Sequence, residues 1–278
     1  MDASFNIKER KMSDFICPVC GKKLNNEGKS LLCPDGHCFD KAKSGYVNLL
    51  MNNGAGRHGD DRLMVRARTE FLGAGYYDPL ANRLAEIASE CGRDGAVIVD
   101  AGCGEGYYSA KIEAASGNRV IGIDISREAV IAAAKRSKTM SLAVASTAAM
   151  PLENSCADMV LNIFSPLFEK EFCRVLKSGG RLIRVFPLEK HLWELKKLVY
   201  DKPYENTEIE LELGGFALER KEKLKYTITL DSGDMIRNLF MMTPYYYKTG
   251  EEDQKKLLAA DSLTTAVEFG IAVYRKAD

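Results

Sequence analysis

Residues 96–106 read Ala96-Val-Ile-Val-Asp100-Ala-Gly102-Cys-Gly104-Glu-Gly106, and this stretch decides the fold. Its first part is apolar and β-branched up to a terminal carboxylate, which is typical of a strand buried on both faces. Glycines then alternate with other residues, and each lets the backbone turn sharply without a Cβ in the way. A helix is predicted from Tyr107 to Ala115, so the stretch forms a strand–turn–helix unit that opens an α/β domain.

A second predicted strand, Arg119 to Ile123, ends at another carboxylate, Asp124. A carboxylate in this place holds a ribose in nucleotide-binding α/β folds. The turn reads D-x-G-x-G-x-G from Asp100, whereas a dinucleotide site reads G-x-G-x-x-G and receives a pyrophosphate at the helix N-terminus. Because Asp100 and Glu105 repel phosphate and attract cations, the turn resembles motif I of class I S-adenosylmethionine methyltransferases. The residues predicted to contact this cofactor are Asp100, Gly102, Gly104, Glu105 and Asp124.

The remaining patterns continue the alternation of strands and helices. Ser126 is predicted to cap a helix that runs to Arg136. Further strands are predicted at 142–145, 157–164 and 181–186, with a helix through Phe172 and Val175. Two β-branched stretches, 226–230 and 264–274, are predicted to form a closing antiparallel pair around a helix at 235–242. The predicted fold class is α/β, a class I methyltransferase with a Rossmann-like, seven-stranded mixed sheet.

The composition is that of an ordinary globular chain. Of its 278 residues, 46% are hydrophobic and 28% charged, which excludes disorder and low complexity. The 39 Lys and Arg balance the 39 Asp and Glu, so nonspecific coating of nucleic acid is disfavoured, although a local basic groove is not. No apolar run approaches the roughly 20 residues of a membrane helix. The first residues lack the apolar stretch of a signal peptide, so we expect a cytoplasmic protein without a membrane partner.

Cysteine is concentrated near the N-terminus. Cys17, Cys20, Cys33 and His37 follow the spacing C-x2-C-x12-C-x3-H, which lies within the range of structural zinc sites. In a reducing compartment, clustered cysteines hold metal more often than they form disulfides. We therefore predict one structural Zn²⁺ held by these side chains, since four protein ligands leave no open position for catalysis. Cys38 stays open as an alternative to His37.

The pattern divides the chain into three parts. Residues 1–53 are predicted to be a zinc-binding domain, because a segment this short has too little core to fold without a metal. Residues 54–92 are predicted to be a linker and helices that cover the cofactor site, and residues 93–278 the methyltransferase domain. A Gly-rich linker near 52–60 precedes an apolar helical pattern from Leu63 to Leu72.

A second helix is predicted to start at Asp78, with Asp78 as its cap and Pro79 at its first position. Leu80, Leu84 and Ile87 would form its apolar face. Tyr77 lies just before this helix and fits either a core position or a pocket wall, and the residues alone favour the core.

Together the motifs resemble one family, the bacterial 23S rRNA guanine-N1 methyltransferases that modify a hairpin loop in domain II. The resemblance rests on the cysteine motifs, on Gly45-Tyr-Val-Asn-Leu-Leu50, on Arg68-x-x-Phe71-Leu72-x-x-Gly75-x-Tyr77-x-Pro79-Leu80, on Gly102-Cys-Gly-Glu-Gly-Tyr-Tyr108, on His191-Leu192-x-Glu194-Leu195-Lys196 and on Thr243-Pro244. These matches span nearly the whole chain, and the cysteine motifs joined to the Gly-Tyr-Val-Asn-Leu-Leu segment are far more specific than the glycine turn.

The resemblance implies further site residues and partners. It places the cofactor against Tyr77, Gly104, Glu105 and His191, although His191 taken alone reads as a surface or helix-start histidine. It also implies a zinc module that helps to hold 23S rRNA, a homodimer with a cleft between subunits, and one of two neighbouring guanines as the target. Of the two groups, we favour the one typical of Gram-positive bacteria.

No catalytic base is identifiable from the sequence. Guanine N1 carries a proton with a pKa near roughly 9, so modest assistance from an acidic side chain or a backbone carbonyl near Asn162 to Pro166 would suffice. The segment Asn162-Ile-Phe-Ser-Pro166 only half matches the motif of exocyclic-amine methylases, which disfavours that kind of target. The target base must leave its stack, and the aromatic residues considered as its platform are Phe164, Phe168, Tyr245, Tyr246 and Tyr247.

Two other functions stay open at this point. One is a methyltransferase that acts on a small molecule or another RNA and carries a structural zinc module. The other is a non-catalytic RNA- or ribosome-binding protein that retains the fold. The acidic stretch from Glu205 to Glu212 is interpreted as a solvated connector.

Overall fold

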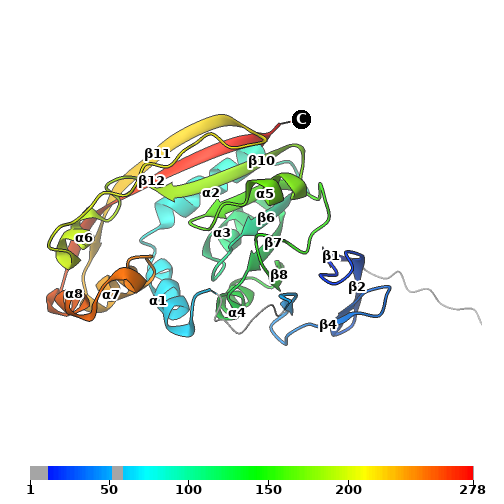
Figure 1. Cartoon of the computed structure of the whole chain (residues 1–278), viewed down its shortest axis with the longest axis horizontal. Helices are drawn as coiled ribbons and strands as arrows, with labels where there is room; N and C mark the ends of the chain where they lie inside the picture. Colours follow the sequence, from blue (N-terminus) through cyan, green and yellow to red (C-terminus); the bar gives the residue numbers. More distant parts are fainter. Residues whose placement is uncertain (1–11, 52–58, 278) are drawn as a thin grey trace, which may run out of the picture.

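The computed structural model describes residues 12–51 and 59–277. They form an α/β structure with two sheets, a four-stranded sheet near the N-terminus and an eight-stranded sheet that organises the rest (Figure 1). Residues 52–58 of the predicted linker lie outside this range. Within it, none of the helices combines the length and the apolar character needed to cross a bilayer.

The small sheet is an antiparallel meander in the order β1-β2-β3-β4. Its strands are β1 (Met12–Ile16), β2 (Lys23–Glu27), β3 (Ser30–Leu32) and β4 (Cys38–Asp40). Gly21 and Gly36 have left-handed backbones, with φ of 74° and 87°, and make the turns that follow β1 and β3. These positions favour glycine because a Cβ would be strained there.

The large sheet has the order β11-β12-β10-β9-β6-β7-β8-β5. Its strands are β5 (Val47–Asn48), β6 (Val97–Ala101), β7 (Arg119–Asp124), β8 (Ser141–Val144), β9 (Ala157–Ile163), β10 (Leu176–Pro187), β11 (Phe216–Leu230) and β12 (Leu263–Lys276). The strands from β5 to β10 are parallel, and β12 is antiparallel to both β10 and β11. This arrangement confirms the predicted mixed sheet with a closing antiparallel pair.

The sheet has eight strands and not the predicted seven. All the predicted strands are present, and the additional one is β5, which pairs in parallel with β8 through Val47 opposite Ala143 and Asn48 opposite Val144. A two-residue strand has no alternation to read, so periodicity could not reveal it. β5 joins the N-terminal segment to the free edge of the large sheet.

The helices are α1 (Arg62–Gly73), α2 (Asp78–Cys91), α3 (Tyr107–Ser116), α4 (Arg127–Arg136), α5 (Glu169–Val175), α6 (Trp193–Val199), α7 (Gly233–Met241) and α8 (Glu251–Lys256). Ser126 caps α4 as predicted, since its side chain accepts a hydrogen bond from the amide of Ala129. The predicted cap of α2 is wrong, because Tyr77 occupies that position and Asp78 is already helical. The Asp78 carboxylate is instead held by Lys111 Nζ at 2.6 Å.

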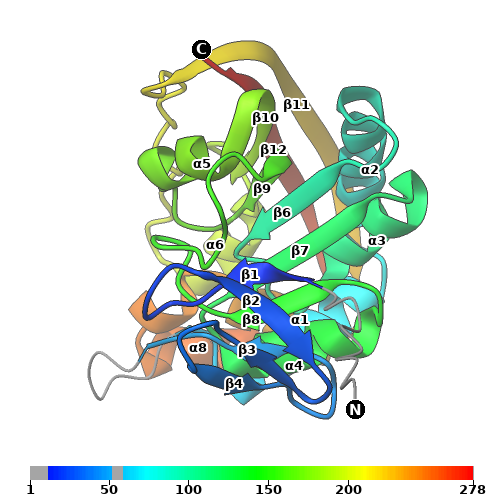
Figure 2. The same ribbon diagram turned by 90° about the vertical axis from the view of Figure 1, so that its right-hand side faces the viewer.

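Each face of the large sheet is covered by a different set of elements. Along β6, Ile98 packs into the core beneath α2 and α3, whereas Val97 and Val99 pack into a second core on the other face. That second core includes Phe172 of α5 and also Phe15 of β1. Figure 2 shows the small sheet beside β7 and β8, and its apolar side chains therefore complete the cover of this face.

The strand order reverses at β6. The chain passes from β6 outward through β7 to β8, and then crosses to β9 on the opposite side of β6. In open α/β sheets such a reversal leaves a crevice at the carboxyl ends of the strands, where ligands bind. The predicted cofactor residues follow these strand ends.

Candidate functional site

The N-terminal cysteine and histidine side chains converge on one point. The ligand atoms of Cys17, Cys20, Cys33 and His37 all lie within 4.8 Å of one another, near the roughly 3.8 Å expected between thiolates on a tetrahedral zinc. The Nδ1 atom of His37 is buried and has no hydrogen-bond partner among the described residues. A metal ion would satisfy it, so the donor set fits zinc.

Local backbone structure builds this cluster. The amide of Gly21 donates to the carbonyl of Cys17 at 2.8 Å, and the amide of Gly36 donates to that of Cys33 at 2.9 Å, so each cysteine begins a tight turn. Cys38 is exposed, begins β4 and is not part of the cluster. The geometry therefore favours His37 over Cys38 as the fourth ligand.

A cavity of about 710 Å³ opens at the carboxyl ends of β6, β7, β9 and β10. All the residues predicted to contact the cofactor line it: Tyr77, Asp100, Gly102, Gly104, Glu105, Asp124 and His191. They come from four places in the chain, namely the residue before α2, the turn after β6, the end of β7 and the segment after β10. The fold thus brings together residues that are more than a hundred positions apart in the sequence.

The glycine turn after β6 is fixed by close packing and by a carboxylate. Gly102 has φ of 96°, and a Cβ there would lie 2.5 Å from the Cβ of Ser165. At Gly104, φ is 54° and the nearest atom to a Cβ would be Arg68 Nη1 at 3.8 Å, so the backbone faces open space. The amide of Gly104 donates to Asp124 Oδ2 at 2.8 Å, which ties the turn to the end of β7.

Asp124 is placed to accept hydrogen bonds from a ligand. Its Oδ1 accepts from the amide of Ser126 at 2.8 Å, and its Oδ2 from Gly104. Burial raises the pKa of Asp124, while these two amides partly oppose that shift. Because each carboxylate oxygen has a second acceptor site, Asp124 can also bind two hydroxyl groups, as on a ribose.

Asp100 and Glu105 are buried carboxylates that are only half satisfied. Asp100 Oδ2 accepts from Ser109 Oγ at 2.5 Å, and Glu105 Oε2 pairs with Arg136 Nε at 2.5 Å. Asp100 Oδ1 and Glu105 Oε1 have no hydrogen-bond partner among the described residues. Burial raises the pKa of Asp100 to about 7 and also raises that of Glu105. Such unpaired anionic oxygens fit a ligand that carries positive charge, as a sulfonium and an ammonium group do.

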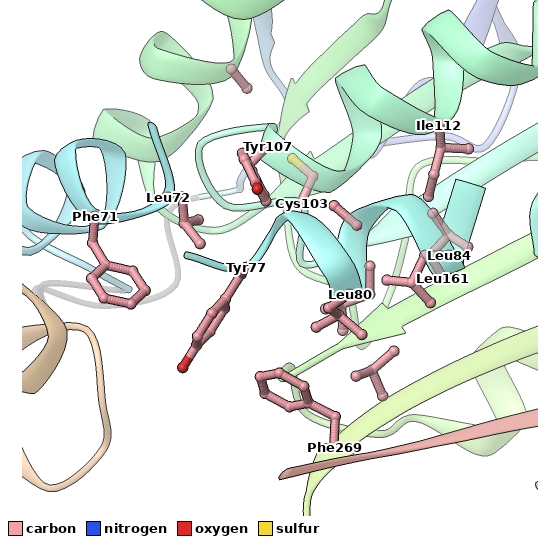
Figure 3. Close-up of a cluster of buried hydrophobic side chains, with 14 of the residues drawn as sticks. Phe71, Leu72, Tyr77, Leu80, Leu84, Cys103, Tyr107, Ile112, Leu161 and Phe269 are labelled. Carbon is pink, nitrogen blue, oxygen red and sulfur yellow. The ribbon is translucent and has the colours of Figure 1, made fainter. Parts of the chain in front are cut away.

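Tyr77 and His191 line the cavity, and both rings pack against the buried ring of Phe269. Tyr77 packs edge-on against Phe71 and Phe269, with ring centroids 5.1 Å apart in both pairs (Figure 3). The ring centroids of His191 and Phe269 lie 4.8 Å apart. Tyr77 is 2% exposed yet lines the cavity, so the core and pocket interpretations of its sequence position are both correct.

The hydrogen bonds of His191 fix its chemical role. Its Nδ1 accepts from the amide of Glu268 at 3.1 Å, so the ring proton of the neutral form resides on Nε2. Burial, together with the charge of Lys196, lowers the pKa of His191 to about 3. His191 is therefore a neutral hydrogen-bond donor at physiological pH and is not available as a general base.

Three of the five aromatic candidates reach the cavity, two of them on the loop after β9 and one after α7. Phe164, Phe168 and Tyr245 line it, whereas Tyr246 and Tyr247 do not. Every carboxylate in the lining comes from Asp60, the turn after β6 or the end of β7. The lining after β9 and β10 contributes none, so it offers no acidic side chain near Asn162 to Pro166.

One hydrogen-bond network beside the cavity was not predicted from the sequence. Lys196 is 1% exposed, and its ammonium donates to Asn206 Oδ1 at 2.7 Å and to the carbonyl of Tyr204 at 2.8 Å. Tyr245 also donates to Asn206 Oδ1, at 2.8 Å. Asn206 and Ile209 line the cavity, so part of the segment interpreted as a solvated connector belongs to its wall. The one feature of the sequence that could have indicated this network was Lys196, in the motif that begins at His191.

A second missed contact lies at the opposite wall. Arg68 and Asp60 form an ion pair, and both residues line the cavity. Arg68 is on α1 and faces Gly104. Its guanidinium lies among the carboxylates at the end of the cavity where the cofactor is predicted to bind, which we call the cofactor end.

Comparison with known proteins identifies both parts of the chain. Residues 15–53 match the zinc-ribbon family model described as RlmA, N-terminal, and residues 99–184 match the model described as Methyltransferase domain. A protein of Bacillus subtilis (strain 168) named "Putative 23S rRNA (guanine-N(1)-)-methyltransferase YxjB" is 34% identical, over 95% of this chain and 98% of the relative. A "23S rRNA (guanine(748)-N(1))-methyltransferase" of Streptomyces fradiae is 33% identical, over 87% of this chain and 89% of the relative.

These relatives extend over nearly the whole chain, and the two family models fall on the cysteine–histidine cluster and on the strands around the cavity. The chain therefore belongs to the 23S rRNA (guanine-N1-)-methyltransferase family, in which a zinc ribbon is joined to a class I S-adenosylmethionine-dependent methyltransferase fold.

Proposed function

We propose that this protein transfers a methyl group from S-adenosylmethionine to N1 of one guanine in a hairpin loop of 23S rRNA domain II. The observation that carries the proposal is the meeting of all the predicted cofactor residues in one cavity, beside a wall free of carboxylates. The names of the relatives supply the target, a guanine N1 of 23S rRNA.

In this proposal, each residue of the cofactor end has a distinct role. Asp124 accepts hydrogen bonds from the ribose hydroxyls, and the open backbone at Gly104 lets the methionine part lie close to the turn. Asp100 and Glu105 complement the positive charge with their unpaired oxygens. Arg68 pairs with the carboxylate of the methionine part. When bound, the cofactor supplies an electrophilic methyl group on a cationic sulfur.

The other end of the cavity positions the base. His191, which we place against the cofactor, donates from Nε2 and does not take up the N1 proton, because its Nδ1 is occupied by the amide of Glu268. A carbonyl oxygen of the Asn162 to Pro166 loop accepts a hydrogen bond from N1–H, and the proton itself leaves to solvent, which is sufficient for a group whose pKa is near roughly 9. Most of the rate enhancement then comes from holding N1 in line with the methyl group.

The zinc ribbon has a structural and a recognition role in this proposal. Cys17, Cys20, Cys33 and His37 hold Zn²⁺, and the ion adds to the small number of buried apolar side chains that this part has. Residues 1–53 then contribute to RNA binding, residues 54–92 cover the cofactor and residues 93–278 carry out the transfer. We propose a homodimer, which light scattering of the purified protein would test.

The deciding experiment is methylation of 23S rRNA isolated from a strain that lacks the gene. With S-adenosylmethionine, the wild-type protein should add one methyl group, recovered as 1-methylguanosine after digestion, and primer extension should locate it in the domain II loop. 23S rRNA from the parent strain is the control, since its site is already occupied. An inert deletion-strain rRNA, or a methyl group at another position, would refute the proposal.

A further inference from the structure

We propose that Phe164 is the platform on which the target base stacks after it has left the RNA loop. This inference rests on the proposed function and adds the residue that receives the base. It follows from the exposure of the side chain, its fixed backbone and its place relative to the cofactor residues.

Phe164 differs from the other large apolar side chains of the cavity in its exposure. It is 44% exposed, whereas Phe186, Tyr245 and Leu72 are all below a tenth. Of the strongly exposed large apolar side chains in the part of the chain that the structure describes, Phe164 alone lines the cavity. Leaving an aromatic ring in water forgoes the free energy of burying it, which favours a ligand that covers the ring.

The backbone holds this ring in a strained and well-supported position. Phe164 has φ of 52°, in the left-handed region that non-glycine residues rarely adopt. Its amide donates to the carbonyl of Val185 at 3.2 Å. Asn162 Nδ2 donates to the carbonyls of Ser165 and Pro166, each at 3.1 Å, and Ser165 Oγ donates to the carbonyl of Ala101 at 2.6 Å. Strain that persists in so constrained a loop is typical of functional sites.

Neighbouring rings further fix the orientation of Phe164. Its ring centroid is 5.4 Å from that of Phe269 and 6.4 Å from that of Tyr108. These contacts come from two separate elements, β12 and α3. The ring is therefore preorganised, and a base can stack on it without first ordering a mobile side chain.

The position of β9 in the sheet separates Phe164 from the ribose site. Asp124 ends β7, on one side of β6, and Phe164 follows β9, on the other side. Asp124 and the turn after β6 would therefore hold the cofactor on one side of the cavity, and Phe164 lies toward the other side. The lining there has no carboxylate, as suits a neutral aromatic base. Aromatic stacking accepts any base, so Phe164 gives affinity and position, while other groups select guanine.

Substitution at position 164 tests this role. Phe164→Asn removes the ring and tolerates the left-handed backbone. We expect kcat/KM for an RNA hairpin that the wild type methylates to fall by about 10- to 100-fold, the range for losing one base-stacking partner. Phe164→Tyr keeps the ring and should stay within about threefold of the wild type by the same reasoning. Phe164→Leu, which is apolar without a π face, serves if the Asn variant fails to fold.

A second readout follows the base itself. In a hairpin with 2-aminopurine at the target position, the wild type and Phe164→Tyr should keep the fluorescence of the flipped base quenched. Phe164→Asn should leave the flipped base unstacked and bright. Tyr247→Asn is the matched control, because Tyr247 is an aromatic residue that is 67% exposed and does not line the cavity.

The outcomes separate this inference from the proposed function. Unchanged kcat/KM and fluorescence in Phe164→Asn would overturn it, given a wild type that methylates the hairpin. A change confined to the affinity for S-adenosylhomocysteine would also overturn it and place the ring against the cofactor. A wild type that methylates no rRNA would refute the proposed function instead.

Discussion

The zinc ribbon and the large sheet are stabilised in opposite ways. Residues 12–51 form short strands around a few buried side chains, among them Phe15, Leu24 and Leu31, and bring together four metal ligands. The large sheet buries both of its faces beneath helices and the ribbon, and its core contains dozens of apolar residues. A small core cannot offset the entropy of ordering its chain, so the ribbon depends on an ion and the sheet does not.

The two regions also differ in how their polar groups are used. In the ribbon, thiolate and imidazole groups point at one another and would be saturated by zinc. In the sheet, Asp100 and Glu105 each keep one buried oxygen unpaired at the strand ends. A closed site gives stability, whereas an open, partly unsatisfied site binds an exchangeable ligand. The two functions should therefore be separable by mutation.

The largest effect is expected for Cys33→Ala. Losing one of four ligands should remove nearly all of the bound zinc and the order of residues 12–51, because the ion holds this part together. The affinity for S-adenosylhomocysteine should stay within about threefold, since the ligand lies against another part of the sheet. Zinc is measured by elemental mass spectrometry and affinity by calorimetry.

Cys38→Ala is the control for this prediction. Cys38 is exposed and outside the cluster, so the zinc content of the Cys38→Ala protein should equal that of the wild type. Full zinc content in Cys33→Ala would refute the ligand set, and zinc lost in Cys38→Ala as well as in Cys33→Ala would restore Cys38 as the fourth ligand.

Asp124→Ala should produce the converse result. Removing the carboxylate costs its hydrogen bonds to the ligand and frees the amide of Gly104, so the affinity for S-adenosylhomocysteine should fall by roughly 100-fold. Zinc content should not change. Glu86→Ala, an exposed carboxylate on α2, is the control. Equal affinity in Asp124→Ala would mean that the ribose is held elsewhere.

Because His191 is buried in its neutral form, we expect the stability of the large sheet to depend on pH. Its pKa is lowered from 6.5 to about 3 when folded, so the unfolded chain binds a proton first as the pH falls. The stability from a neutral His191 is present above pH 6.5 and is lost below it, by about 2 kcal/mol between pH 7 and pH 5. His191→Asn keeps an acceptor for the amide of Glu268, and its stability should not show this fall between pH 7 and pH 5.

Urea unfolding of the ligand-free protein at pH 7 and pH 5 measures the difference. Between pH 7 and pH 5 the wild type should lose about 2 kcal/mol more of its unfolding free energy than the variant. Parallel losses in the two proteins would show that other groups cause the pH dependence, and that His191 is protonated in the folded state.

The smallest effect concerns the link between the regions. Val47 of β5 is 2% exposed and packs in the core shared by the ribbon and the sheet. Val47→Ala should cost about 1 kcal/mol and accelerate hydrogen exchange in residues 12–51, with zinc content and cofactor affinity unchanged. Asn48→Ala, a change at the exposed residue next to Val47, is the control. Unaltered exchange would mean that β5 does not hold the ribbon in place.

The sequence predicted those parts of the site that depend on local pattern. The apolar run of β6, the glycine turn and Asp124 follow one another in a βαβ unit, and the fold brings them to one crevice as predicted. The cysteine spacing likewise predicted the metal cluster, because two tight turns are enough to gather its ligands. The predicted cap of α2 was wrong, because Tyr77 takes the cap position and the Asp78 carboxylate bonds Lys111 of α3, a contact that no local pattern records.

What the sequence by itself determined is the set of elements and the two chemically distinctive motifs, because periodicity, glycine placement and ligand spacing are local properties. Only the tertiary structure decided that His191 is a donor, that Asn206 joins the cavity through Lys196, and that Phe164 alone of the aromatic candidates faces the cavity with an exposed ring. Each of these depends on a partner from a distant strand or loop. A hydrogen bond or a covered ring is set by what lies across the fold, which no local pattern records.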